Sequence, residues 1–285
     1  MTVPVFLEYL RLIRPVNCLL ALVGVWLGAY LTWVTPVYYG PLMASIGAFL
    51  ICAGGNAAND LVDIEIDRIN RPRRVLVRGA VSKRAAGWFA VSLYAAGLVV
   101  ASAVNLWVLG TAVIVVLLLY AYNYRLKRIP LVGNVTVAVM AGLTFMTGGL
   151  AVDSLLAFRL PGPLLPASFA FFFHLVREII KDIEDIEGDK AAGVSSLPQK
   201  IGESGALLIA LGFFVVLTIL TYIPVFSGWF SDLYKVIAVY IVDLPLLALL
   251  IIVWGYPTKR ILAISSFALK VGMMLGLVAL VASRH

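Results

Sequence analysis

The sequence predicts an all-helical protein that crosses a membrane nine times. The chain of 285 residues is 62% hydrophobic, has a mean hydropathy of +1.02 and is only 13% charged, which lies outside the range of soluble domains. Its apolar residues form long runs without charge, and short charged stretches separate these runs. A helix needs about 20 apolar residues to cross a bilayer. We therefore expect one polytopic domain over residues 1–285, with its helices arranged around a central cavity.

The nine expected helices follow from the apolar runs in chain order. The run 15–59 is long enough for two helices, separated near Pro36 and Pro41. The run 85–124 holds two more, with a turn near Asn105. Each remaining run fits a single helix of membrane-spanning length. These five helices are expected at 129–152, 160–180, 203–225, 234–254 and 261–282.

Four residues within the expected helices stand out by their chemistry. Asp243 and Lys270 lie in the last two helices. Because isolated charges inside a bilayer are costly, we predict that these two residues pair with each other. Cys18 and Cys52 also fall within expected helices. We interpret them as small apolar packing residues rather than as a disulfide or a metal site.

The distribution of basic residues predicts which side of the membrane each loop faces. Of the 22 lysines and arginines, 18 lie on the side of the N-terminus and of the loops after the second, fourth, sixth and eighth helices. Cytoplasmic loops are enriched in Lys and Arg, so we expect a multi-pass protein of the cell membrane with a cytoplasmic N-terminus. The net charge of +7 is then a consequence of topology. We expect no nucleic-acid partner and infer no obligatory protein partner.

Two acidic stretches repeat one pattern on this cytoplasmic side. Ten of the 15 acidic residues lie within 60–67 and 178–189, and the segments DLVDIEID (60–67) and DIEDIEGD (182–189) share the spacing Asp-x-x-Asp-Ile-Glu-x-Asp. Residues three and four apart lie on one face of a helix. Each segment is therefore expected to present a stripe of carboxylates. The cytoplasmic loops 60–84 and 182–202 carry these stripes.

The carboxylate stripes favour a divalent metal, because closely spaced carboxylates repel one another and a cation removes that cost. Hard oxygen ligands suit Mg²⁺, which typically keeps some of its water and is shared with substrate phosphates. A solvated acidic loop is the alternative for either stripe alone, but the repeated spacing favours metal binding at both. The candidate metal ligands are Asn59, Asp63, Asp67, Asp182, Asp185 and Asp189.

Basic residues near both stripes are candidates for contacting phosphate groups. Arg offers paired hydrogen bonds to phosphate, and Lys supplies a compact charge. Arg177 and Lys181 are notable because they lie near the last turns of an otherwise apolar helix, where the enrichment of loops in positive charge does not account for them. The candidate diphosphate-binding cations are Arg74, Lys127, Arg128, Arg177 and Lys181.

These motifs resemble those of the UbiA superfamily of intramembrane prenyltransferases. The family's Asn-x-x-x-Asp-x-x-x-Asp motif is present as Asn59, Asp63 and Asp67, and its second motif, Asp-x-x-x-Asp, as Asp185 and Asp189. The resemblance covers the whole chain, including nine helices and cytoplasmic acidic loops. It implies that these four aspartates serve in an Mg²⁺-dependent transfer of a prenyl group.

Two further sequences of the family lie near the cytoplasmic ends of helices. Arg-Pro-x-Asn is present as Arg14 to Asn17, and Gly-Asn after the fourth helix is present as Gly133 and Asn134. The resemblance implies a role in substrate binding for Asn17 and Asn134. Hydrogen bonding between helices is the alternative for both residues.

Within the superfamily, the segments 63–74 and 177–198 are most similar to archaeal digeranylgeranylglyceryl phosphate synthases. That similarity implies transfer of a geranylgeranyl group from geranylgeranyl diphosphate to geranylgeranylglyceryl phosphate, the second ether bond of archaeal membrane lipids. The partners would be a prenyl diphosphate donor, a lipid-phosphate acceptor and membrane lipid. The chain departs from the family twice, because Val75 follows Arg74 where proline is usual, and Tyr122 precedes Lys127 by five residues rather than four. Tyr122 is kept as a candidate catalytic residue.

Three other functions share parts of this pattern. An aromatic-acid acceptor of the 4-hydroxybenzoate type would use the same metal site, so it stays open as an alternative acceptor. A phosphatidyltransferase is disfavoured because its motif begins with Asp-Gly, a dipeptide that the sequence lacks. A membrane transporter would be supported by the internal repeat, but the repeat is parallel and its carboxylates lie at one face. Transporter sites usually lie near the middle of the bilayer.

Overall fold

The computed structural model describes residues 4–34, 38–191 and 195–284. Every regular element in these ranges is a helix, and none of the described residues forms a strand. The predicted all-α class is therefore confirmed. The chain divides into two compact units, one formed by 1–127 and 143–163 and the other by 128–142 and 164–285. Whether 1–285 acts as a single domain stays a prediction.

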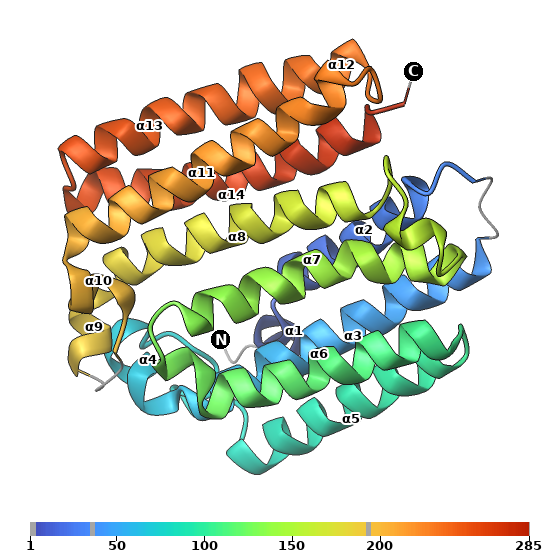
Figure 1. Ribbon diagram of the computed structural model, residues 1–285. Helices are drawn as coiled ribbons and strands as arrows, with labels where there is room; N and C mark the ends of the chain where they lie inside the picture. The colour runs from blue at the N-terminus through green and yellow to red at the C-terminus, as the bar shows by residue number, and fades with distance from the viewer. Residues whose placement is uncertain (1–3, 35–37, 192–194, 285) are drawn as a thin grey trace. The chain divides into compact units, whose positions relative to one another are not determined.

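The first unit is built around α3, which packs against α2, α5 and α6 (Figure 1). Helix α7 contributes its second part, residues 143–152, to this unit. The elements of the unit are α1 (Val5–Ile13), α2 (Pro15–Tyr30), α3 (Tyr39–Val62), α4 (Ile64–Asn70), α5 (Lys83–Ser102), α6 (Leu106–Tyr124), α7 (Val132–Val152, shared) and the 3₁₀ turns η1 (Leu126–Arg128, shared) and η2 (Leu156–Phe158).

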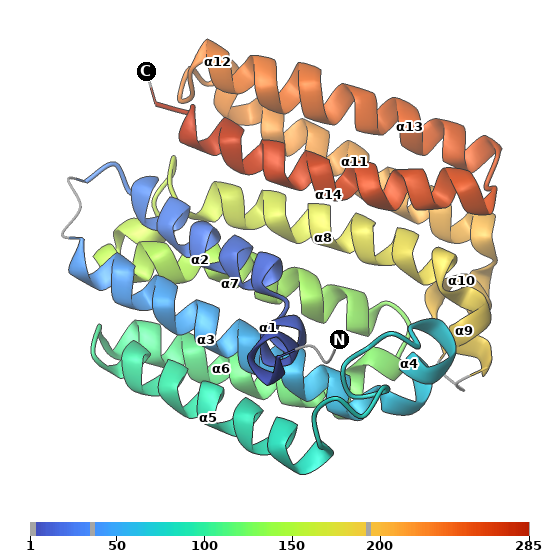
Figure 2. The ribbon, with the colours of Figure 1, turned by 180° about the vertical axis from the view of Figure 1, so that it is seen from behind.

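The second unit is built around α8 and α11, which pack along each other, while α14 packs against α8 and α13 (Figure 2). The first part of α7 belongs to this unit. Its other elements are α8 (Leu164–Glu184), α9 (Ile186–Ala191), α10 (Leu197–Ile201), α11 (Glu203–Phe226), α12 (Asp232–Lys235), the π-helical segment η3 (Val236–Asp243), α13 (Leu244–Gly255) and α14 (Lys259–Val281).

Seven helices of the described residues are long and apolar enough to cross a membrane, and the bent pair α1–α2 would make eight. Here α12, η3 and α13 count as one span. Helix α8 falls outside this group because Arg177, Glu178 and Lys181 lie among its last residues. The chain is thus a multi-pass membrane protein. The count of nine and the cytoplasmic N-terminus stay predictions.

Helix α1 precedes the first helix expected from the sequence and meets α2 at an angle of 49°. The bend lies at Arg14, which adopts a left-handed conformation with φ 52° and ψ 70°. The next residue, Pro15, starts α2, and a proline disfavours the helical conformation in the residue before it. Helix α1 is amphipathic, with Phe6 exposed and Leu12 fully buried. This helix was not predicted from the sequence, because its apolar stretch is too short to span a bilayer.

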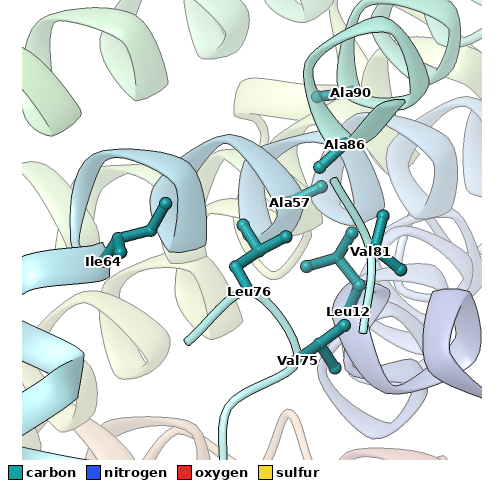
Figure 3. Packing of buried hydrophobic residues seen from close by; sticks show 8 residues of the cluster. All are labelled: Leu12, Ala57, Ile64, Val75, Leu76, Val81, Ala86 and Ala90. Atoms are coloured by element: carbon teal, nitrogen blue, oxygen red, sulfur yellow. The ribbon is translucent and has the colours of Figure 1, made fainter. Parts of the chain in front are cut away.

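A hydrophobic cluster in the first unit fixes the segment that follows the first acidic stretch (Figure 3). Val75, Leu76 and Val81 of this segment are buried in it. Full burial of such side chains stabilises the fold by about 1.5–3 kcal/mol each. The cluster therefore holds the neighbouring Arg74 in a defined place. The other members come from α1, α3, α4 and α5, namely Leu12, Ala57, Ile64, Ala86 and Ala90.

Helix α2 and the second part of α7 approach each other closely at two glycines. A Cβ atom at Gly28 would overlap the backbone carbonyl of Phe145, and one at Gly148 would overlap the carbonyl of Val25. The obstacles are backbone atoms, which cannot rotate away as a side chain can. The contact between these two helices therefore depends on the absence of side chains at both positions.

The predicted ion pair between Asp243 and Lys270 is wrong. Asp243 ends the π-helical segment and is 2% exposed, and its carboxylate accepts a hydrogen bond from the Thr221 hydroxyl of α11. Across the ranges that the structure describes, no ion pair joins Asp243 to Lys270, which is partly exposed on α14. A hydroxyl on the adjacent helix satisfies the carboxylate, so a cation is not required there.

Candidate active site

The first acidic motif lies at the junction of α3 and α4. Asp63 occupies the junction itself, with φ −92° and ψ 9°. The backbone hydrogen bonds of a helix continue through it, because Asp63 N donates to Asn59 O at 3.0 Å and Asp67 N donates to Asp63 O at 2.7 Å. Asn59, Asp63 and Asp67 therefore follow one another at intervals of one turn, although the helix that carries them is broken.

Both carboxylate oxygens of Asp63 are engaged by other predicted site residues. Asn59 Nδ2 donates to Asp63 Oδ2 at 2.9 Å, and the Lys127 ammonium donates to Asp63 Oδ1. The side chains of Asp63 and Lys127 are 18% and 10% exposed, so little water screens this ion pair. The structure thus brings three predicted residues together around a single carboxylate.

Asp60 holds two arginines and is almost completely buried, with 2% of its surface exposed. Arg14 Nη2 and Arg74 Nη1 both donate to its Oδ1 atom. Arg74 also places its Nε atom 4.0 Å from Asp67 Oδ2. From the sequence, Asp60 was predicted only as a member of the first acidic stripe, without a separate role. The pairing of Asp60 with Arg14 could not be predicted from the local sequence, because 46 residues separate the two.

Asp67 is the most buried carboxylate of the first metal motif, with 7% of the residue exposed. Burial raises the pKa of the Asp67 carboxyl, and the positive charge of Arg74 opposes this increase. The nearby carboxylates of Asp60 and Asp63 raise the pKa further. This mutual repulsion is the electrostatic cost that a divalent cation would remove.

The second acidic motif has the same backbone construction. Asp185 lies at the junction of α8 and α9, its N–H donates to Lys181 O at 2.9 Å, and Asp189 N donates to Asp185 O at 3.0 Å. Asp189 is therefore part of the short helix α9. Residues 192–194 of the predicted loop 182–202 lie outside the described residues.

Asp182 is held by an amide in the second unit. Asn134 Nδ2, in the first part of α7, donates to Asp182 Oδ2 at 2.8 Å, and Asn134 is 7% exposed. Asn134 and Asp182, two of the predicted site residues, are therefore in contact. Their hydrogen bond joins α7 to α8, which is the interhelical bond expected for Asn134 as the alternative to substrate binding. A neutral amide orients this carboxylate without cancelling its charge.

Arg177 and Lys181 both contact Glu178, and the charge of Lys181 also acts on Asp182. Arg177 Nη1 lies 2.7 Å from Glu178 Oε1, and Lys181 Nζ lies 3.9 Å from Glu178 Oε2. The Nε atom of Arg177 is buried and has no hydrogen-bond partner among the described residues. An unused guanidinium donor of this kind is available for an anionic group of a ligand.

The remaining predicted residues are placed without a defined role. Asn17 is exposed in the first turn of α2, Tyr122 is half-buried on α6, and Arg128 is exposed at the end of η1. In the described part of the chain, no hydrogen bond or ion pair joins Asn17 to the first motif. Their roles in substrate binding or catalysis stay predictions.

The residues present fit a Mg²⁺ site in chemistry but do not form a preassembled cage. Within the described ranges, no three His, Cys, Asp or Glu side chains converge closely enough to hold a metal ion. The motifs nevertheless supply carboxylate oxygens one helical turn apart, which are the ligands that Mg²⁺ prefers, together with its own waters and substrate phosphates. At Asp63 a metal ion would compete with the ammonium of Lys127.

A comparison with protein families identifies the family to which these motifs belong. The model of the UbiA prenyltransferase family matches residues 17–271. The chain belongs to the UbiA prenyltransferase family. The resemblance that the two aspartate motifs indicated is therefore confirmed, and the chain is an enzyme of the prenyltransferase class.

Relatives within the UbiA family share most of their length with this chain. The digeranylgeranylglyceryl phosphate synthase of Methanopyrus kandleri is 39% identical over 280 residues, which cover 96% of this chain and 98% of the relative. The synthase of the same name from Methanococcus aeolicus is 35% identical over 277 residues, or 96% of each chain.

Solved structures share the UbiA fold. A structure of a digeranylgeranylglyceryl phosphate synthase superimposes with a TM-score of 0.78 at 32% identity, covering 98% of both chains. A UbiA homologue from Archaeoglobus fulgidus, bound to GPP and Mg²⁺, gives a TM-score of 0.67 at 22% identity, covering 96% of this chain and 99% of the other. At 22% identity, the comparison with the Archaeoglobus fulgidus protein shows a shared fold and nothing more specific.

Proposed function

We propose that the protein transfers a geranylgeranyl group from geranylgeranyl diphosphate to geranylgeranylglyceryl phosphate. The product would be digeranylgeranylglyceryl phosphate, with diphosphate as the leaving group. The observation that carries this proposal is the similarity over nearly the whole chain to synthases of that name. We further propose that 1–285 is a single domain with a cytoplasmic N-terminus, so that both motifs face the cytoplasm. The excess of Lys and Arg on that side supports this topology.

We propose Mg²⁺ as the cofactor of this reaction. When bound, Mg²⁺ stabilises the negative charge that builds on the departing diphosphate. The residues that would hold it are Asn59, Asp63 and Asp67 in the first motif, and Asp182, Asp185 and Asp189 in the second. The fold neighbours from Archaeoglobus fulgidus, bound to Mg²⁺ with GPP or with DMAPP, support a requirement for a divalent metal.

Basic side chains would bind the phosphate groups of the two substrates. Lys127 and Arg74 lie beside the first motif, and Arg177 and Lys181 precede the second. The Nε atom of Arg177 is buried and has no hydrogen-bond partner within the described part of the chain, which supports a role in anion binding. Their positive charges would hold the diphosphate and favour cleavage of the bond between its oxygen and the prenyl carbon. Arg128 is proposed as a further contact.

The chemistry then joins two lipid substrates. Cleavage of the C–O bond of the donor leaves an allylic cation, which the hydroxyl oxygen of the acceptor attacks. The hydroxyl proton passes to a carboxylate near the reacting carbon. Water must be excluded because it would capture the cation. Tyr122, Asn17 and Asn134 are proposed to position the substrates during these steps.

The test is a transfer assay with the purified protein in lipid nanodiscs. Geranylgeranyl diphosphate and Mg²⁺ would be supplied with either geranylgeranylglyceryl phosphate or 4-hydroxybenzoate, and the product detected by mass. We expect product with the glyceryl phosphate and none after EDTA removes the metal. Product with the aromatic acid alone would overturn the proposed acceptor while keeping the enzyme class.

A further inference from the structure

Two cysteines on separate helices lie next to each other in the first unit. Cys18 is in the first turn of α2, Cys52 is in α3, and both thiols are free. Asn56 Nδ2 lies 3.7 Å from Cys18 Sγ and 3.8 Å from Cys52 Sγ. The two side chains are also close enough to interact electrostatically with each other. Apolar packing, as interpreted from the sequence, therefore describes only part of their environment.

The polar groups around the two sulfurs belong to the bend between α1 and α2. The backbone carbonyl of Ile13, the last residue of α1, accepts a hydrogen bond from Cys18 Sγ at 3.1 Å and from Asn56 Nδ2 at 2.8 Å. The positive charge of Arg14 also acts on both sulfurs. The amide of Asn56 and the carbonyl of Ile13 thus give the two sulfurs polar neighbours inside an otherwise apolar helix contact.

The two cysteines differ in exposure in a way that sets an order of reaction. Cys52 is partly exposed, whereas Cys18 is fully buried. Because Cys52 lies in the membrane-spanning helix α3, a lipid-soluble oxidant would reach Cys52 first, and the buried Cys18 would react second. We propose that Cys18 and Cys52 are a site of reversible disulfide formation that links α2 covalently to α3.

The reaction would proceed by thiol–disulfide exchange with a small-molecule disulfide. The Cys52 thiolate attacks that disulfide, forms a mixed disulfide and releases one small thiolate. The Cys18 thiolate then attacks the Cys52 sulfur and releases the second small thiolate. The two protein thiols lose two electrons in total, the small disulfide gains them, and the two protons pass to the released thiolates.

The link would act on the bend that carries Arg14. Once Cys18 is bonded to Cys52, its sulfur no longer has a hydrogen to donate to the Ile13 carbonyl, and the first turn of α2 is tied to α3. Arg14, at the bend, pairs with Asp60 two turns after Cys52 along α3. Cross-linking also restricts the unfolded chain, so oxidation should stabilise the first unit.

The test uses the reduced, full-length protein in nanodiscs and 2,2′-dipyridyl disulfide as the oxidant. We expect the release of two pyridinethiones per chain, a mass lower by two hydrogens, and a single cross-linked peptide pair containing residues 18 and 52. The apparent Tm should rise and return after reduction. A retained pyridyl adduct, a disulfide between two chains, or no release of pyridinethione would each overturn the proposal.

Two single variants test the order of attack. Cys18→Ser should keep one pyridyl adduct on Cys52, because no second thiol resolves it. Cys52→Ser should react much more slowly, because its remaining thiol is buried. Fast modification of the Cys52→Ser variant would contradict the order. The wild-type mass result decides the proposal even if either variant folds poorly, and it does not depend on transfer activity.

Discussion

The two acidic motifs share a backbone construction and differ in how their carboxylates are balanced. In each, the middle aspartate lies at the junction of a long helix and a short one. In the first motif, Lys127 pairs with Asp63. In the second, the amide of Asn134 holds Asp182, and the nearby cations contact Glu178. Repetition in sequence has thus produced two electrostatic environments.

This difference indicates how each motif would receive a cation. A metal ion at Asp63 must displace the ammonium of Lys127 or share the carboxylate with it. The ammonium set free in this way is then available for the diphosphate. Burial raises the pKa of Asp182 to about 7, although the hydrogen bond from Asn134 opposes this increase. Near neutral pH an incoming cation would therefore displace a proton from part of the Asp182 population rather than an ammonium group. In the proposed site, metal binding at the first motif would therefore be coupled to movement of the Lys127 side chain.

The largest effect is expected from removing the junction aspartates. Asp63→Ala and Asp185→Ala should each reduce the rate of prenyl transfer by about 10²–10³-fold, as for the loss of a contact that stabilises transition-state charge. Asp232→Ala is the matched control, because this side chain is 99% exposed. Full activity in Asp185→Ala alone would restrict the metal function to the first motif.

The second largest effect is expected on the unfolding free energy, which should fall more for a variant in the first acidic stretch than for one in the second. Asp60→Asn would leave Arg14 and Arg74 without their shared carboxylate, and breaking such a buried ion pair costs about 3–5 kcal/mol of unfolding free energy. Asp182→Asn should cost less, about 1 kcal/mol, because its partner is a neutral amide. Thermal unfolding of both variants in the same detergent makes the comparison. Equal losses would show that charge balance does not distinguish the two sites.

Metal affinity in the absence of substrate should respond to Lys127. Lys127→Met removes the competitor from Asp63, and a hydrogen bond between charged groups is worth about 1.5–3 kcal/mol. We expect Mn²⁺, used as a probe for Mg²⁺, to bind about tenfold more tightly by calorimetry. Lys235→Met is the control, because Lys235 lies near Asp232, which belongs to neither motif. Unchanged affinity in Lys127→Met would contradict the competition.

The smallest effect is expected at the amide of the second motif. Asn134→Ala removes one buried hydrogen bond and should lower the unfolding free energy by about 1 kcal/mol. Asn17→Ala, at an exposed position, should change it by less than about 0.5 kcal/mol. Chemical or thermal unfolding measures both. A larger loss at Asn17 would point to a structural role that its exposure does not suggest.

The sequence predicted the features that depend on local pattern. The apolar runs located the long helices, and the four-residue spacing of Asn59, Asp63 and Asp67 predicted their succession along one helical path. The duplicated aspartate motif also indicated membership of the UbiA family. These features depend on hydropathy and helical periodicity, which act over short distances along the chain.

Features that depend on contacts between distant residues were not predictable in the same way. Nothing local indicates that Asp60 binds Arg14, or that Asn134 binds Asp182. The predicted pairing of Asp243 with Lys270 failed for the same reason, since charge alone does not reveal a hydroxyl such as that of Thr221 on a neighbouring helix. The breaks at Asp63 and Asp185 were also missed, because carboxylate spacing is the same in a continuous helix.

The contact between α2 and α7 has a consequence for mutational tolerance. At Gly28 and Gly148 even a single methyl group would meet backbone atoms. Exposed positions of the same helix α2, such as Leu19 at 51% exposure, can exchange one apolar side chain for another at little cost. In a library selected for folding, positions 28 and 148 should retain only glycine while Leu19 varies. This contact is therefore one of the least evolvable parts of the first unit.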